Sequence, residues 1–263
     1  MKETAAGLVK ILPGQFAQAI IFFTRIALPE QFSRIADHRS GLDRAAPVFP
    51  LAGLAIGLVA GSLYWCASLF LPSTLAAALA LAASLLLTGA LHEDGLADCA
   101  DGLGGGHSRD RALDIMRDSR IGVYGACALV LSLIMRWSAL AALTAGGGFL
   151  ALLIAHSASR GAIAIALAVS TYARREGAGS LVSSGINSTE LGATLAVSLV
   201  IALLAGGFAG ICAVGAGWLA AWLFLRYFEH RIGGYTGDCL GAMQQACEIT
   251  ALALFAGFWS GAL

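Results

Sequence analysis

Three aspartates near the middle of the chain have the side chains and the spacing that suit a divalent cation. Asp94, Asp98 and Asp101 are spaced i, i+4 and i+7, which puts them on one face of a helix. Carboxylates on one face repel one another unless they are protonated, widely solvated or bound to a metal. The spacing therefore predicts oxygen ligands for one or two hard cations.

A second pair of aspartates follows a glycine-rich break. The glycines at 104–106 are predicted to end the first helix, and Ser108 is predicted to cap the next one. On that second helix Asp114 and Asp118 are again spaced i, i+4. A hairpin of this kind would aim two rows of carboxylates at each other.

The chemistry that such a segment favours is phosphoryl transfer. Residues 92–120 contain seven of the 16 acidic residues of the chain. A metal would neutralise phosphate charge, orient a leaving group and activate a hydroxyl. Arginines beside the acids could hold phosphate oxygens. The alternative is a solvated charged loop with local salt bridges. The arginines are Arg109, Arg111, Arg117 and Arg120.

The composition says what must position this segment. Of 263 residues, 58% are hydrophobic and 12% are charged, whereas soluble domains carry about 25% charged residues. This excludes a disordered chain, a soluble coiled coil and a typical cytosolic enzyme. We expect an all-α polytopic membrane helix bundle formed by one domain, 1–263. The net charge is zero, so we expect no nucleic-acid partner. The six cysteines form no CxxC pair and predict neither a disulfide framework nor a zinc site.

About seven transmembrane helices are expected, together with a shorter N-terminal helix. The stretch 16–28 is too short to cross the bilayer, so it predicts an interfacial or re-entrant helix. The stretch 191–225 is too long for one span, and Gly206 and Gly207 are expected to divide it. The remaining predicted spans are 48–71, 75–91, 121–143, 149–172 and 240–259.

The distribution of Lys and Arg predicts the orientation. Seven spans put fourteen of the 16 basic residues on one side, in the N-terminal region and in alternate loops. We therefore expect a multi-pass protein of the inner membrane whose N-terminus and active site face the cytoplasm.

Two arginines and a glutamate fall inside predicted spans, where a charge is costly and usually faces protein or a water-filled cavity. Arg160, with His156 one turn before it, is expected to reach a polar cavity below the acidic segment. Arg136 is expected to lie near the outer end and to snorkel or pair with lipid. Together with Glu248, these residues also leave open an ion-coupled or proton-coupled transporter.

Longer motifs resemble a known family. HEDGLADCADGLGGG, followed by RALDIMRDSRIGVYG, resembles the signature of the cobalamin synthases, the adenosylcobinamide-GDP ribazoletransferases. Three weaker matches are AIIFFTRIALP, APVFPLAGLAIG and GGYTGDCLGAMQQACE, so the resemblance runs from about residue 16 to about residue 248. It implies a membrane enzyme that joins adenosylcobinamide-GDP to α-ribazole or α-ribazole 5′-phosphate and releases GMP. The resemblance also implies Mg²⁺ as the cofactor and leaves the oligomeric state open.

The resemblance also assigns roles to residues of the catalytic segment, 92–120, and beyond it. Asp98 and Asp118 are predicted to be catalytic, with Asp118 as the general base. The predicted metal ligands are Asp94, Asp98, Asp101, Asp114 and Asp118. The predicted substrate contacts are His92, His107, Arg117, Arg120, Arg160 and Asp238.

A second enzyme class shares part of the pattern. The CDP-alcohol phosphotransferases of lipid synthesis use membrane-embedded aspartates, and the stretches 98–102 and 114–118 match their motif in part. Their Ala-Arg pair is missing here, because 103–106 reads Leu-Gly-Gly-Gly. This class remains the alternative.

Overall fold

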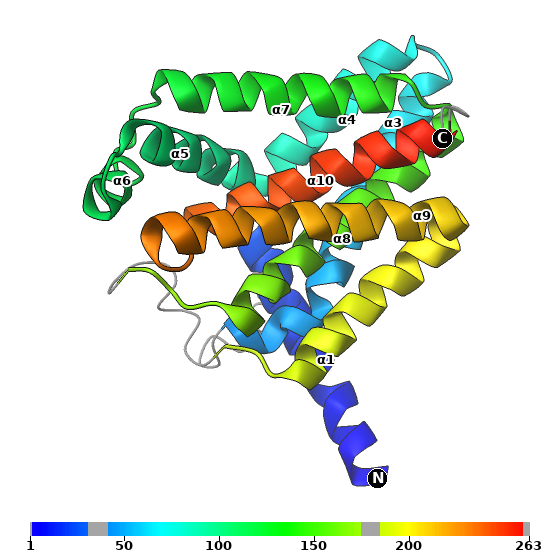
Figure 1. Ribbon diagram of the computed structural model, residues 1–263. Coiled ribbons are helices and arrows are strands. Elements are labelled where there is room, and N and C mark those ends of the chain that lie inside the picture. The colour runs from blue at the N-terminus through cyan, green and yellow to red at the C-terminus, as the bar shows by residue number, and fades with distance from the viewer. Residues whose placement is uncertain (1, 31–41, 175–184, 260–263) are drawn as a thin grey trace.

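The computed structural model describes residues 2–30, 42–174 and 185–259, and this part of the chain is helical (Figure 1). The predicted all-α class is therefore confirmed. Three of the basic residues used to predict orientation, Arg34, Arg39 and Arg175, lie outside the described residues. The helices are α1 (Lys2–Phe23), the 3₁₀ helix η1 (Leu42–Val48), α3 (Phe49–Ser68), α4 (Ser73–Thr88), α5 (Leu91–Gly105), α6 (Arg109–Ile115), α7 (Val123–Ala141), α8 (Ala145–Val169), α9 (Ser188–Ile232) and α10 (Gly237–Trp259).

Five helical stretches of the described chain are long and apolar enough to cross a membrane: η1 with α3, and α7, α8, α9 and α10. Helices α4 and α5 meet this criterion only together, bent by 88°, which brings the count to six. The predicted break in the long apolar run is confirmed, because Gly207 has non-helical angles (φ 55°, ψ −136°) and divides α9 into two arms. The expected seven spans are reached only if these arms are counted separately.

The N-terminal helix differs from its predicted bounds. Helix α1 ends at Phe23, five residues before the predicted end. The chain leaves the helix because the Arg25 amide donates to the carbonyl of Leu87 at the end of α4 (2.7 Å). Helix α1 is not among the candidate spans, and its interfacial or re-entrant placement stays a prediction.

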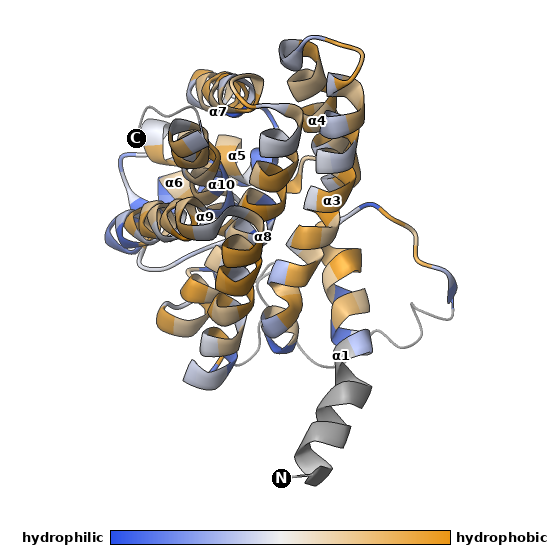
Figure 2. Cartoon of the chain, turned by 90° about the vertical axis from the view of Figure 1, so that its right-hand side faces the viewer, coloured by the Kyte–Doolittle hydropathy of each residue, from blue (hydrophilic) through white to orange (hydrophobic). Residues whose placement is uncertain are grey.

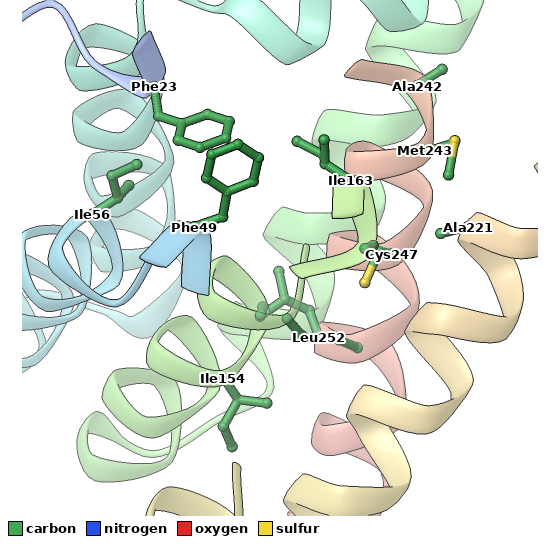
Figure 3. Close-up of a cluster of buried hydrophobic side chains, with 14 of the residues drawn as sticks. Phe23, Phe49, Ile56, Ile154, Ile163, Ala221, Ala242, Met243, Cys247 and Leu252 are labelled. Atoms are coloured by element: carbon green, nitrogen blue, oxygen red, sulfur yellow. The ribbon is translucent and has the colours of Figure 1, made fainter. Parts of the chain in front are cut away.

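Small residues bring the central helices together. Glycines 53, 57 and 61 face α8, and a Cβ at Gly57 would lie 2.7 Å from the Leu152 carbonyl oxygen. Close packing of small residues is how membrane helices associate without a hydrophobic driving force between them. Figure 2 shows apolar residues along both α3 and α8. Figure 3 shows the core beside them, where Phe23 and Phe49 meet edge to face at 4.9 Å.

A sharp turn between α4 and α5 positions the acidic segment. The segment does not continue the helix of the predicted span 75–91. Gly89 (φ 65°) and Ala90 (φ 55°) both adopt left-handed angles and turn the chain away from α4. Helix α5 then crosses α10 closely, since a Cβ at Gly95 would lie 2.7 Å from the Asp238 carbonyl oxygen.

Candidate active site

The three aspartates of α5 lie on its polar face, as predicted. Asp94 is exposed, and Asp98 and Asp101 are half-buried. Helix α5 has 15 residues, too few to cross a bilayer, so we treat it as lying outside the spanning segments. The pKa of Asp98 is raised to about 7, first by burial and then by the charges of Asp94 and Asp238. The carboxylates therefore form one repelling cluster.

A fourth aspartate joins this cluster from the far end of the sequence. Asp238 lies in the first turn of α10, and the close crossing of α5 and α10 brings it beside Asp94. Its carboxylate accepts hydrogen bonds from Arg174 (2.9 Å) and from the Thr236 hydroxyl (3.2 Å). Asp238 was predicted as a substrate contact, and the structure places it on the wall of a cavity that Asp94 shares.

Asp101 also has a structural task. Its two carboxylate oxygens accept hydrogen bonds from the backbone amides of Gly122 (2.7 Å) and Gly125 (2.8 Å). These amides begin α7, where a helix has no internal acceptors for its first N–H groups. Asp101 therefore caps α7 from a neighbouring helix. A carboxylate has about four lone-pair sites, so two remain for another ligand.

The second row of aspartates is arranged differently from the prediction. Ser108 caps α6 as expected, by accepting from the Arg111 amide (3.3 Å). However, α6 ends at Ile115, so Asp114 lies in the helix and Asp118 lies beyond it. Asp118 is paired with Arg120, which lowers its pKa to about 2. The expectation that both aspartates share one helical face is wrong, because the helix is only seven residues long.

The fit of these residues to a metal ion can be judged from charge and donor type. Within 2–30, 42–174 and 185–259, no three His, Cys, Asp or Glu side chains are grouped closely enough to hold an ion as they stand. The α5 carboxylates nevertheless supply the oxygen donors that Mg²⁺ prefers. The raised pKa of Asp98 shows a local excess of negative charge that a cation would relieve. The residues fit a hard cation in chemistry, and metal binding stays a prediction.

A network of ion pairs lies buried between α5, α7, α8 and α10. Arg136 donates to Glu93 (2.9 Å) and to Glu248 (3.1 Å). Arg160 donates to the other oxygen of Glu248 (2.9 Å), which His156 also contacts (3.1 Å). The two arginines and Glu248 are each 1% exposed. Two arginines are therefore matched by two glutamates in this network.

This network corrects two expectations. Arg136 does not snorkel or pair with lipid, because its guanidinium lies between Glu93 and Glu248. Arg160 is fully buried with Glu248 and does not reach an open cavity. Its predicted contact with substrate therefore stays a prediction that the described arrangement does not favour. The in-span charges that suggested a transporter are bonded to one another.

Two arginines close the end of the bundle near the acids. Arg109 donates to the carbonyls of Ile232 (2.9 Å) and Ala173 (2.7 Å). Arg231 donates to the carbonyls of Leu103 (3.1 Å) and Gly106 (3.0 Å). Each cation thus satisfies carbonyls at a helix C-terminus, where positive charge is favourable.

The remaining predicted substrate contacts divide between the surface and the interior. His107, Arg117 and Arg120 are exposed on or beside α6, and Arg117 lies 4.0 Å from Asp114. His92 is buried, at 3% exposed. Arg117 and Arg120 pair with the second row of aspartates, Asp114 and Asp118, and not with the α5 cluster.

The sequence analysis did not predict a role for several polar residues of the buried network. The sequence around Glu93 is acidic and gives no sign that its side chain points into the core toward Arg136. Gln244 and Gln245 continue the network, since they donate to Glu248 and to Glu93 respectively. The signal that could have found them is the polar run Gln-Gln-x-x-Glu inside an apolar span.

Comparison with known proteins identifies the family. The model of the cobalamin-5-phosphate synthases matches residues 15–256. The chain belongs to this family. The match includes α5, the network and Asp238, and it confirms the family that the motifs predicted. No solved structure matches the chain.

Individual relatives agree with the family match over nearly their whole length. A protein of Ralstonia nicotianae is 44% identical over 239 residues, which cover 89% of this chain and 91% of the relative. A protein of Azorhizobium caulinodans is 45% identical over 243 residues, which cover 89% and 92%. Both are named adenosylcobinamide-GDP ribazoletransferase. The predicted assignment to a transferase of cobalamin biosynthesis is thereby confirmed.

Proposed function

We propose that this chain joins adenosylcobinamide-GDP to α-ribazole or α-ribazole 5′-phosphate, releases GMP and requires Mg²⁺. The names of the relatives support the reaction. The single observation that supports the location of the site is the gathering of Asp94, Asp98 and Asp238, where burial first and then the charges of Asp94 and Asp238 raise the pKa of Asp98 to about 7. Charge of this density suits a cation and the pyrophosphate that the cation would accompany.

In this proposal Asp94 and Asp98 of α5 would hold the metal ion. Asp94 lines the cavity at α10, Asp98 follows it one helical turn later on α5, and Asp101 has lone pairs left beside its capping bonds. A bound Mg²⁺ would neutralise the pyrophosphate and polarise the phosphorus that is attacked. Asp114 and Asp118 are predicted as further ligands; Asp114 is exposed, and Asp118 is half-buried and paired with Arg120.

The chemical step transfers a cobinamide-phosphoryl group from GMP, a phosphate leaving group, to an alcohol. A ribose hydroxyl of ribazole forms a bond to the phosphorus that carries cobinamide, and the bond from that phosphorus to the GMP oxygen breaks. The hydroxyl proton passes to a carboxylate. Asp118, the predicted base, fits this role poorly, because a general base needs a pKa near the working pH. The pKa of Asp118 is held at about 2 by Arg120.

We further propose that the site faces the cytoplasm from the inner membrane. The positive-inside rule supports this orientation. The predicted cytoplasmic loops also lie together at one end of the bundle, which supports the same orientation. Arg109, from the loop after α5, bonds to Ala173 after α8 and to Ile232 at the end of α9.

The test is an assay of the purified protein in lipid nanodiscs. We expect GMP to be released when adenosylcobinamide-GDP, ribazole 5′-phosphate and Mg²⁺ are all present, and none when EDTA replaces the metal. A CDP-alcohol phosphotransferase would instead release CMP from a CDP-linked lipid. Release of CMP without release of GMP would overturn the proposal.

A further inference from the structure

A small cavity lies beside the acids of α5. Its volume is about 170 Å³, and it is bounded by α1, η1, α3, α5, α8 and α10. Apolar side chains form most of its wall, among them Phe49, Ile163 and Leu167. Figure 3 shows Phe49 and Ile163 facing each other. Asp94 and Asp238 lie on the polar side of the wall.

The size of this cavity limits what it can hold. Pockets for drug-sized ligands measure about 300–1,000 Å³, so a corrinoid or a whole guanosine diphosphate is too large. A flat bicyclic ring of apolar character suits both the volume and the lining. The substrates of the proposed reaction carry guanine, adenine and benzimidazole rings, and of these flat bicycles the benzimidazole of ribazole, with its two methyl groups, has the fewest polar atoms.

One polar atom in the wall has no partner. His92 is 3% exposed and lines the cavity, and its buried Nε2 makes no hydrogen bond to any residue of the described part of the chain. A buried polar atom without a partner is costly, and a ligand that supplies the partner gains that free energy. The ring of His92 is held by stacking on Phe23 (5.8 Å between centroids). The benzimidazole ring of ribazole has one free nitrogen, which can accept a hydrogen bond.

Asp94 connects this cavity with a more polar one. The second cavity has a volume of about 420 Å³ and is bounded by Arg25, Thr88 and the turn that begins α5. Asp94 and Leu91 line both cavities. A ring held in the apolar cavity would therefore leave its attached ribose near Asp94, with room for phosphate on the side of Arg25.

We propose that the apolar cavity between α5, α8 and α10 binds the benzimidazole ring of ribazole, with His92 Nε2 donating a hydrogen bond to the free ring nitrogen. This inference rests on the proposed function, and it assigns the nucleoside to one side of Asp94. A hydrocarbon chain would leave His92 without a partner and gives no reason for two aspartates in the wall.

The experiment measures binding of α-ribazole to the full chain in nanodiscs by calorimetry, without metal or corrinoid. It is paired with an analogue in which the free ring nitrogen is replaced by CH. We expect the analogue to bind about tenfold more weakly to the wild-type protein. On the variant His92→Leu, the two ligands should bind alike, because the hydrogen bond is gone. Equal binding of both ligands to the wild type would overturn the proposal.

Filling the cavity gives a second test that does not depend on His92. Leu167→Phe should weaken α-ribazole binding about tenfold or more, whereas the KM for adenosylcobinamide-GDP should stay within about twofold. The matched control is Ala128→Leu, which fills an apolar cavity on the opposite face of α5 and should leave ribazole binding unchanged. Weaker binding in Ala128→Leu but not in Leu167→Phe would contradict the assignment. If the wild type releases GMP but shows no effect of the ring nitrogen, the cavity assignment alone fails.

Discussion

Glu93 and Asp94 are adjacent in the sequence and lie in opposite environments. Glu93 is 7% exposed and pairs with Arg136 in the core. Asp94 is exposed and lines two cavities. The buried network around Glu93 is balanced in charge, whereas the α5 cluster around Asp94 is not. In the described part of the chain, four aspartates gather at the α5 cluster and one arginine, Arg174, pairs with them through Asp238, so this region keeps an excess of acidic side chains.

The largest effect is expected from breaking the buried network. Glu248→Ala leaves two arginines buried without their shared carboxylate, which should cost about 3–5 kcal/mol of unfolding free energy. Thermal unfolding followed by tryptophan fluorescence measures this loss. The double variant Glu93→Gln/Arg136→Gln removes one charge of each sign and should cost less than its two single variants summed. Additive costs would mean that the pair is not coupled.

A substitution in the α5 cluster should lower activity and leave stability nearly unchanged. Asp98→Asn keeps the shape of the side chain and removes its charge, so the midpoint of thermal unfolding should stay within about 3 °C of wild type. Turnover should fall about 10²–10³-fold, since a metal supplies several kcal/mol of transition-state stabilisation. GMP release at saturating substrate measures the loss. Turnover near the wild-type level would remove Asp98 from the site.

The crossing of α5 and α10 links the two regions. Gly95→Ala places a methyl group against the Asp238 backbone, and overpacking of this kind costs about 1–3 kcal/mol. We expect both the unfolding midpoint and turnover to fall, because the shift also moves Asp94 from Asp238. The control is Gly192→Ala on α9, where no atom lies within 4 Å of the new Cβ. A Gly95→Ala variant with normal stability would show that the helices can separate freely.

Asp101 belongs to the α5 cluster and also stabilises the fold by capping α7. Asp101→Ala removes the acceptor for two amides of α7 and should cost about 1 kcal/mol of stability, as for other helix caps. Asp101→Asn keeps one acceptor oxygen and should cost less. Chemical denaturation of the two variants beside the wild type measures the difference. Equal losses would mean that the charge, and not the hydrogen bonds, stabilises α7.

The smallest expected effect is the dependence of stability on pH. The folded-state pKa of Asp98 is raised from 3.8 to about 7, so the folded protein binds this proton more tightly than the unfolded chain does. Stability from this group is present below about pH 4 and is lost as the pH rises toward 7. Without divalent metal, the unfolding midpoint of the wild type should decline across this window more than that of Asp98→Asn. Parallel pH profiles would contradict the raised pKa.

The sequence predicted the helices and their ends better than it predicted the side-chain contacts between helices. The predicted spans, the kink at Gly207 and the cap at Ser108 follow from hydropathy, glycine conformation and local hydrogen bonding, which depend on neighbouring residues. The 88° turn before α5 was missed, because Ala90 adopts left-handed angles that its residue type does not predict. Arg136 was misplaced because its partners, Glu93 and Glu248, come from two other helices.

The acidic residues show the same limit. Their spacing correctly placed Asp94, Asp98 and Asp101 on one face of a helix. Spacing could not show that Asp101 caps α7 or that α6 ends before Asp118. It also could not show that Glu93 turns to the core, since one residue along a helix rotates the side chain by about 100°.

Direct titration of a metal tests the central claim, that the α5 cluster is the unbalanced charge of this molecule. Mn²⁺ is added to the full chain in nanodiscs without substrates, and free Mn²⁺ is followed by electron paramagnetic resonance. The account predicts saturable binding to the wild type, loss of that binding in the double variant Asp94→Asn/Asp98→Asn, and no loss in Glu93→Gln. Binding to the double variant as tight as that to the wild type would contradict the account.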